Sequence, residues 1–427
     1  MQSKHIKDMI EKNRGGQRRG LYSVCSANEL VLRAAMRHAL AHKYPLVIES
    51  TANQVNQYGG YTGIKPNEFI KWVKSLATEE GLDINNLIMG GDHLGPLLWQ
   101  KENEEAAMAK SIELVESYTK AGFTKIHLDT SMKLADDPAG PLDPRTCARR
   151  GAILAQAVYK SFSSMQANGV RPFFVIGSEV PIPGGSQEHE DSLTPTKAED
   201  FLEQISIYKD EFKKAGIDFN DVAAFVVQPG VEFGDDFVFL YEDEKASSLT
   251  GALKKVEGIV FEGHSTDYQC RKNLSDLVRD GVGILKVGPA LTFVLREALF
   301  LLEEIEEILT PSSSRSNLKN TLLEAMNGDK QFWEKYYSGS TEEIEYKKFY
   351  SYSDRCRYYL PNEKVQKAMD KLIQNLPKIP PALLSQYFPN QYRLYMEGKL
   401  KNKPLDIIYD RIGNLCDDYA AACGYLG

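Results

Sequence analysis

Ionisable and polar side chains recur at the ends of short apolar runs through roughly the first 290 residues of the chain. They are Glu49, Asp92, His93, Asp129, Ser131, Glu179, Gln228, Glu262, His264 and Lys286. A buried charge costs several kcal/mol unless it is paired or bound to a metal. The recurrence therefore predicts that these side chains converge on one polar site that binds a ligand.

Two histidines and a glutamate in this set have the residue types of a divalent-metal site. His93 and His264 both lie beside carboxylates, in a chain that has only seven histidines. A single histidine near a strand end is more often a structural hydrogen-bonding residue, but two in similar positions favour metal binding. With Glu179 they form a set of two imidazoles and one carboxylate that leaves a coordination position open. We therefore predict a divalent metal ion, Zn²⁺ or else Mn²⁺, Co²⁺ or Ni²⁺.

Acidic residues near these candidate ligands could transfer protons. Asp92 directly precedes His93, and adjacent strand residues point to different sides, so Asp92 could face the substrate as a general acid or base. Alternatively, Asp92 caps a helix or orients a metal ligand. Asp129 and Ser131 allow the same two interpretations, with a helix N-cap as a rival role for Ser131. Asp92, Asp129 and Glu49 are the candidate catalytic residues.

The apolar runs that precede these residues have the lengths of β-strands. They are LYSVCS (21–26), LVIES (46–50), LIMGGD (87–92), KIHLD (125–129), FFVIGSE (173–179), AAFVVQ (223–228), GIVFEGH (258–264) and GILKVG (283–288). Amphipathic helical patterns separate them, which is typical of parallel βαβ units. We therefore predict an α/β fold, a (β/α)₈ TIM barrel over residues 1–308. A doubly wound open sheet is the alternative, but the first turn after a strand lacks G-x-G-x-x-G.

From Pro311 the alternation stops, and residues 309–427 are expected to form a helical, aromatic-rich extension. Arg355 and Arg357 lie among its tyrosines. They could pack and pair at an interface, or reach over the barrel mouth to hold a phosphate bidentately. A phosphate could also bind where VGPALT (287–292) leads into a helix, since barrel phosphate sites commonly lie at such an N-terminus. No G-x-x-x-x-G-K-[ST] motif is present, so a P-loop kinase is not supported.

Bulk properties narrow the class of protein. The chain has 427 residues and a formal net charge of −8, which argues against general affinity for nucleic acid or anionic membranes. Its six cysteines contain no C-x-x-C pair, as in reducing compartments. The charged start has no apolar core of a secretory signal, and no apolar run reaches the ~18 residues of a membrane span. A cytoplasmic location is therefore expected.

Long motifs in this sequence resemble those of a known family. They are SVCSAN (23–28), TANQVNQYGGYTG (51–63), GGDHLGP (90–96), GFTKIHLDTSM (122–132), GSEVPIPGG (177–185), VVQPGVEF (226–233), GHSTDYQ (263–269), LKVGPALTF (285–293) and SDRCRYYLP (353–361). They are similar to the Z-type subunits of D-tagatose-1,6-bisphosphate aldolase, the GatZ/KbaZ family. The resemblance implies a (β/α)₈ fold, an oligomer and a Y-type class II aldolase subunit as a partner.

The strand ends also resemble, more distantly, those of the Y-type subunit. The resemblance implies that Asp92 and His93 correspond to a catalytic aspartate and a zinc histidine, and that His264 corresponds to the last zinc histidine. Two departures stand out: Glu179 replaces a histidine, and GHSTDY (263–268) replaces a Gly-Gly-x-Gly phosphate loop. The residues expected to contact substrate are Asn53, Gln54, Ser131, Gln228, Asp267, Lys286, Gly288 and Arg355.

Three functions remain open at this point. The chain could carry out metal-dependent retro-aldol and aldol chemistry on a ketohexose or ketohexose phosphate in the tagatose pathway. It could be a stand-alone C4-epimerase that interconverts fructose and tagatose or their 6-phosphates, since epimerisation shares the C3–C4 cleavage step. It could also be a non-catalytic subunit that stabilises a class II aldolase, as Z subunits are held to do.

Overall fold

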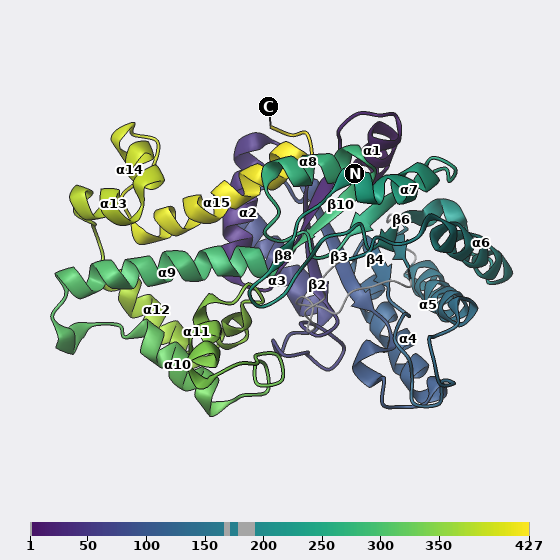
Figure 1. The fold of residues 1–427 in the computed structure, drawn as a ribbon, viewed down its shortest axis with the longest axis horizontal. Coiled ribbons are helices and arrows are strands. Elements are labelled where there is room, and N and C mark those ends of the chain that lie inside the picture. The colour runs from purple at the N-terminus through teal and green to yellow at the C-terminus, as the bar shows by residue number, and fades with distance from the viewer. Residues whose placement is uncertain (1, 166–170, 178–192, 427) are drawn as a thin grey trace.

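Eight parallel strands close into a barrel in the computed structural model, which describes residues 2–165, 171–177 and 193–426 (Figure 1). The strands are β1 (Leu21–Cys25), β2 (Leu46–Thr51), β3 (Leu87–Leu94), β4 (Lys125–Leu128), β5 (Phe173–Ile176), β6 (Val222–Val227), β9 (Val260–Gly263) and β10 (Val282–Val287). Each pairs with its neighbours along the chain, and β1 pairs with β10. All eight predicted strand runs overlap one of these strands, so the predicted (β/α)₈ barrel is confirmed. A small antiparallel pair, β7 (Glu232–Phe233) and β8 (Val238–Phe239), follows β6.

Helices cover the outside of the barrel. They are α2 (Glu29–His42), α3 (Pro66–Glu80), α4 (Glu104–Ala121), α5 (Pro144–Ser164), α6 (Ala198–Lys214), α7 (Asp243–Leu253), α8 (Arg271–Arg279) and α9 (Pro289–Leu309). Local sequence sets their ends: α4, for example, starts after Asn103, whose side chain accepts a hydrogen bond from the Ala106 N–H, and ends at Gly122 with φ 96°. None of the helices among the described residues is long and apolar enough to cross a membrane.

The interior of the barrel has an apolar layer of its own, which the first helix helps to bury. Helix α1 (Gln2–Arg14) packs against β6, β9 and β10. Its Ile6, Met9 and Ile10 join an apolar cluster formed by inward-facing strand residues such as Ile88 and Ile284. The spacing of these three residues is that of one helix face, a signal that the sequence analysis did not use. The polar side chains therefore occupy the other end of the barrel, where the strands finish.

The chain beyond α9 is helical, as predicted. Its helices are α10 (Leu318–Gly328), α11 (Thr341–Tyr350), α12 (Glu363–Asn375), α13 (Pro381–Tyr387), α14 (Pro389–Met396) and α15 (Pro404–Ala422), with a short 3₁₀ helix, η5 (Arg355–Tyr359), before α12. In Figure 1, α9 projects from the barrel and α15 runs back beside it, where it also packs on α2 and α8. The apolar core outside the barrel continues into these helices. A domain boundary between residues 308 and 309 stays a prediction.

Candidate functional site

A pocket of about 760 Å³ opens at the carboxyl ends of the barrel strands. Its lining comes from strand ends such as those bearing Asp92 and His264, from the loop after β2, and from the segment between α10 and α12. Small-molecule sites typically enclose ~300–1,000 Å³. The pocket is therefore large enough for a sugar or sugar phosphate, and it joins the barrel to the C-terminal extension.

Strand β3 brings two functional candidates to the pocket through an irregular end. Its pairing register with β4 shifts between Gly91 and Leu94, and His93 adopts a left-handed φ of 50°. A non-glycine residue in this conformation is uncommon and is often found at functional sites. As a result Asp92 and His93 both line the pocket, whereas simple strand alternation would have turned them apart. Their side chains lie close together, with His93 Nε2 3.6 Å from Asp92 Oδ2.

Three imidazoles form a triangle at the strand ends. The ring centroids of His93 and His264 are 5.0 Å apart, those of His93 and His127 are 5.1 Å apart, and those of His127 and His264 are 5.2 Å apart. His93 and His264 were predicted from the sequence, but His127, which lies within β4, was not. Polar and apolar residues alternate in KIHLD (125–129), and this signal could have placed His127 on the inward face.

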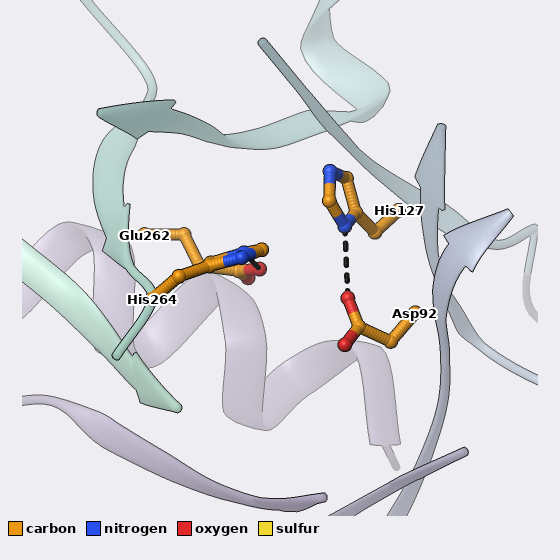
Figure 2. A group of neighbouring side chains, drawn as sticks. All are labelled: Asp92, His127, Glu262 and His264. Carbon is orange, nitrogen blue, oxygen red and sulfur yellow. Dashed lines mark hydrogen bonds and ion pairs between the residues drawn. The ribbon is translucent and has the colours of Figure 1, made fainter. Parts of the chain in front are cut away.

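A carboxylate holds one nitrogen of each imidazole. Asp129 Oδ2 lies 2.9 Å from His93 Nδ1, and Glu262 Oε1 lies 3.0 Å from His264 Nε2. Asp92 Oδ1 lies 2.8 Å from His127 Nδ1 (Figure 2). Such carboxylate–histidine pairs fix the ring orientation and the tautomer of metal-binding histidines.

The donor set fits a divalent metal ion. Nε2 of His127 is fully buried and has no hydrogen-bond partner among the described residues, which is costly unless a ligand uses it. Ligand atoms of Asp92, His127, Glu262 and His264 lie within 4.8 Å of one another. Figure 2 shows these four side chains. His93 is not one of these four, but its ring lies beside that of His264, so the predicted ligands His93 and His264 come together. Glu179 lies outside the described residues, so its part in the set stays a prediction.

A layer of paired charges lies beneath the imidazoles. Lys125 Nζ is 2.6 Å from Glu49 and 2.7 Å from Glu262, and Lys286 Nζ is 3.3 Å from Glu49. Lys286 also forms an ion pair with Asp92. Gly90 makes room for this layer, because a Cβ atom there would lie 2.5 Å from Cγ of Glu49. Each of these carboxylates is therefore charge-compensated inside the barrel.

These contacts set the protonation of the site. Burial by itself would raise the pKa of Asp92, but His93 and Lys286 hold it well below its usual value. Lys125 and His264 likewise lower the pKa of Glu262 in spite of burial. Burial, helped by the charge of Lys286, lowers the pKa of His264 to about 3. The carboxylates are therefore anionic and His264 is neutral near pH 7, which are the states that bind metal ions.

Comparison with known proteins places the chain in a family. Residues 6–424 match the family model described as D-tagatose-1,6-bisphosphate aldolase subunit GatZ/KbaZ-like. The chain belongs to this family. It is 41% identical to the D-tagatose-1,6-bisphosphate aldolase subunit GatZ of Salmonella gallinarum and 42% identical to that of Klebsiella pneumoniae, over 98% of this chain and 99% of each relative. A crystal structure of a probable tagatose 6 phosphate kinase from Sinorhizobium meliloti 1021 is 40% identical, with a TM-score of 0.87 over 95% of this chain and 100% of that one.

The GatZ/KbaZ-like pocket contains most of the residues predicted to contact substrate. Those that line it are Asn53, Gln54, Asp267, Lys286, Gly288 and Arg355. Ser131 does not, and its hydroxyl instead donates to Asp129 at 2.6 Å. Gln228 also lies elsewhere, and its side-chain oxygen accepts hydrogen bonds from the N–H groups of Gly230 and Val231. Direct contact of Ser131 and Gln228 with substrate stays a prediction. In this structure both side chains form hydrogen bonds within their own loops.

Two of the three candidate catalytic residues of this GatZ/KbaZ-like chain lie behind the pocket lining. Asp129 orients His93 and Ser131, and its pKa is lowered by His93 in spite of burial. Glu49 lies in the charge layer between Lys125 and Lys286. Asp92 is the only one of the three that lines the pocket.

Aromatic side chains from two distant segments form one wall of the pocket. Tyr61, in the loop after β2, lies edge-on to Tyr358 at 5.1 Å and to Phe332 at 6.3 Å between ring centroids. Phe332 and Tyr358 stack on one another at 4.9 Å. All three line the pocket, so the extension is part of the site.

Proposed function

We propose that this GatZ/KbaZ-like chain binds a divalent metal ion and makes and breaks the C3–C4 bond of a ketohexose or ketohexose phosphate. The observation that carries the proposal is the triangle of carboxylate-oriented imidazoles beside Asp92, two of which, His93 and His264, line the pocket with Asp92. Nε2 of His127 is fully buried without a hydrogen-bond partner among the described residues, and a site that binds no ligand has no physical need for such an atom.

His127 and His264, with His93 beside them, are the described residues that would hold the ion. A divalent ion there would polarise the ketose carbonyl and stabilise the negative charge that develops when the bond breaks. The protein supplies ligands that are already oriented, because carboxylates hold their rings, and burial keeps His264 neutral.

Asp92 is the group best placed to move a proton. It lines the pocket and is anionic near pH 7, since Lys286 and two imidazoles surround it. Taking the proton of the C4 hydroxyl lets C4 become an aldehyde carbonyl, while the electrons of the C3–C4 bond pass into a C2–C3 enediolate. Returning the proton reverses the step and re-forms the bond.

C4-epimerisation is a second candidate, and the aromatic wall favours it. Cleavage, rotation of the aldehyde fragment and re-addition invert C4 only if both fragments stay in the pocket. Tyr61, Phe332 and Tyr358 form one wall of that space from the chain's own loops. An aldolase releases the fragments, whereas an epimerase re-adds them.

The family name raises a third candidate, a subunit that acts only beside a Y-type aldolase partner. The isolated chain, loaded in turn with Zn²⁺, Mn²⁺, Co²⁺ or Ni²⁺, should be incubated with fructose, tagatose and their 6-phosphates. Interconversion identifies an epimerase, and trapped three-carbon fragments identify an aldolase. The variant His264→Ala should be inactive in either assay. Activity that appears only after a Y-type subunit is added would overturn intrinsic catalysis and support the partner role.

A further inference from the structure

The N-terminus of α9, where the sequence suggests a phosphate site, has its hydrogen-bond donors already engaged. Oδ1 of Asp267 accepts from the N–H of Gly288 at 2.9 Å and from that of Ala290 at 2.8 Å. Pro289 between them has no N–H, and the N–H of Leu291 donates to the Gly288 carbonyl. A carboxylate thus takes the position at the helix terminus that favours an anion, and it repels a second one.

The loop between β9 and α8 is shaped to hold Asp267 there. Ser265 and Tyr268 have left-handed φ values of 53° and 63°, and the Thr266 hydroxyl donates to the Lys286 carbonyl at 2.6 Å. These residues form GHSTDY, the segment that stands in place of a glycine-rich phosphate loop. The sequence departure therefore has a structural consequence: the usual phosphate position of a barrel is filled by the chain itself.

Three cations line the pocket on the wall that the extension contributes. They are Lys335, Arg355 and Arg357, and none of them pairs with a carboxylate within the described part of the chain. Arg355 is only 3% exposed, and its Nε has no hydrogen-bond partner among the described residues. A buried guanidinium without a counter-ion is costly, so this wall is complementary to an anion.

The two arginines are positioned before any ligand arrives. They follow Asp354, which has a left-handed φ of 45° and accepts hydrogen bonds from Thr292 at 2.6 Å and Arg296 at 3.4 Å, both on α9. Nη1 of Arg355 donates to the Phe332 carbonyl at 2.8 Å, and Nη1 of Arg357 donates to the Asp354 carbonyl at 3.0 Å. Preorganised donors lose little entropy on binding.

We propose that Arg355, Arg357 and Lys335 bind the phosphate of a phosphorylated ketohexose, in place of the N-terminus of α9. The inference rests on the proposed function, because it assigns the far end of the same substrate. The reacting carbons lie at Asp92 and the imidazoles, and the phosphate lies against the extension. The fork of an arginine side chain matches phosphate geometry, and charge-assisted bonds to it are strong.

Isothermal titration calorimetry on the full chain tests the proposal with D-fructose 6-phosphate, D-fructose and inorganic phosphate as probes. The wild type should bind the sugar phosphate more tightly than the free sugar. Arg357→Gln should weaken binding of the sugar phosphate by about 10- to 100-fold and leave free fructose unchanged. Lys335→Gln, at an exposed position that tolerates substitution, should lower it by about 3- to 10-fold. Lys330→Gln is the matched control, since Lys330 lies in the same segment, faces solvent and does not line the pocket.

Equal affinity of the wild type for fructose and its 6-phosphate would overturn the inference, as would unchanged sugar-phosphate binding in both Arg357→Gln and Lys335→Gln. Should Arg357→Gln fail to fold, Lys335→Gln decides alone. If inorganic phosphate binds by itself, the three cations recognise the anion alone; if only the sugar phosphate binds, the pocket recognises the whole molecule. Loss of inorganic phosphate binding in Arg357→Gln would support the assignment of these cations as the phosphate site. Selective phosphate binding by a chain without turnover would leave this inference standing and the proposed catalysis refuted. Turnover of free ketohexoses by a chain that binds the sugar and its phosphate equally well would support the proposed catalysis and refute this inference.

Discussion

Nδ1 of His127 lies 2.8 Å from Oδ1 of Asp92, although the two residues belong to different strands, β4 and β3. The contact links the candidate base to a candidate metal ligand. It fixes the His127 ring so that the buried Nε2 is the nitrogen left for a ligand. Binding of an ion and the charge of Asp92 are therefore coupled through one hydrogen bond.

Removal of either buried imidazole should remove the metal. We expect about one divalent ion per purified chain and less than about a tenth of that in His127→Ala and in His264→Ala, because each substitution removes one of the imidazole ligands of the site. Elemental analysis by mass spectrometry measures this. His5→Ala, on α1 and away from these imidazoles, is the control and should keep the ion. A full complement of metal in His127→Ala would exclude His127 from the site.

Asp92→Asn should separate proton transfer from metal binding. The amide keeps the shape of the side chain but cannot accept the hydroxyl proton, so turnover should fall by about 10²- to 10⁴-fold while the metal content stays near that of the wild type. Steady-state kinetics together with elemental analysis give both quantities. A variant with near-normal turnover would remove Asp92 from the mechanism, and one that loses its metal would make Asp92 a ligand instead of the base.

The buried charge layer should contribute strongly to stability. Lys125→Met leaves Glu49 and Glu262 without the cation that lies 2.6 and 2.7 Å from them, and it should lower the free energy of unfolding by about 3–5 kcal/mol. Urea unfolding followed by circular dichroism measures this. Lys120→Met breaks only an exposed pair with Glu116 and should cost less than about 1 kcal/mol. Equal effects of the two substitutions would contradict the role given to the layer.

Asp267 should produce a stability difference that depends on pH. Burial raises its pKa to about 6, although two backbone N–H groups oppose the shift. The pKa of Asp267 in the folded protein exceeds its pKa of about 3.9 in the unfolded chain, so protonated Asp267 stabilises the fold. This contribution to the free energy of unfolding is present in full below about pH 4 and is lost as the pH rises through about 6. The wild type should therefore lose on the order of 2 kcal/mol relative to Asp267→Asn between pH 4 and 7. Urea unfolding of both proteins at several pH values checks this, and a constant difference would contradict the raised pKa.

The sequence by itself determined the barrel and most of the residue types of the site. Buried parallel strands need apolar residues on both faces, and the helices between them need one apolar face, so both patterns are written locally along the chain. Polar residues that interrupt such a pattern at strand ends mark the mouth of the barrel. Asp92, His93 and His264 were found in this way.

Tertiary structure alone decided which of these residues meet and what each contacts. His127 belongs to the site because β4 faces the barrel interior there, and Asp92 and His93 share a side because β3 is irregular and His93 has a left-handed φ. Asp267 reaches the start of α9 only through its folded loop, and the cations of the extension line the pocket although they follow the barrel by tens of residues. Local patterns encode the direction of each side chain along its own element, whereas distances between elements follow from strand register and barrel closure.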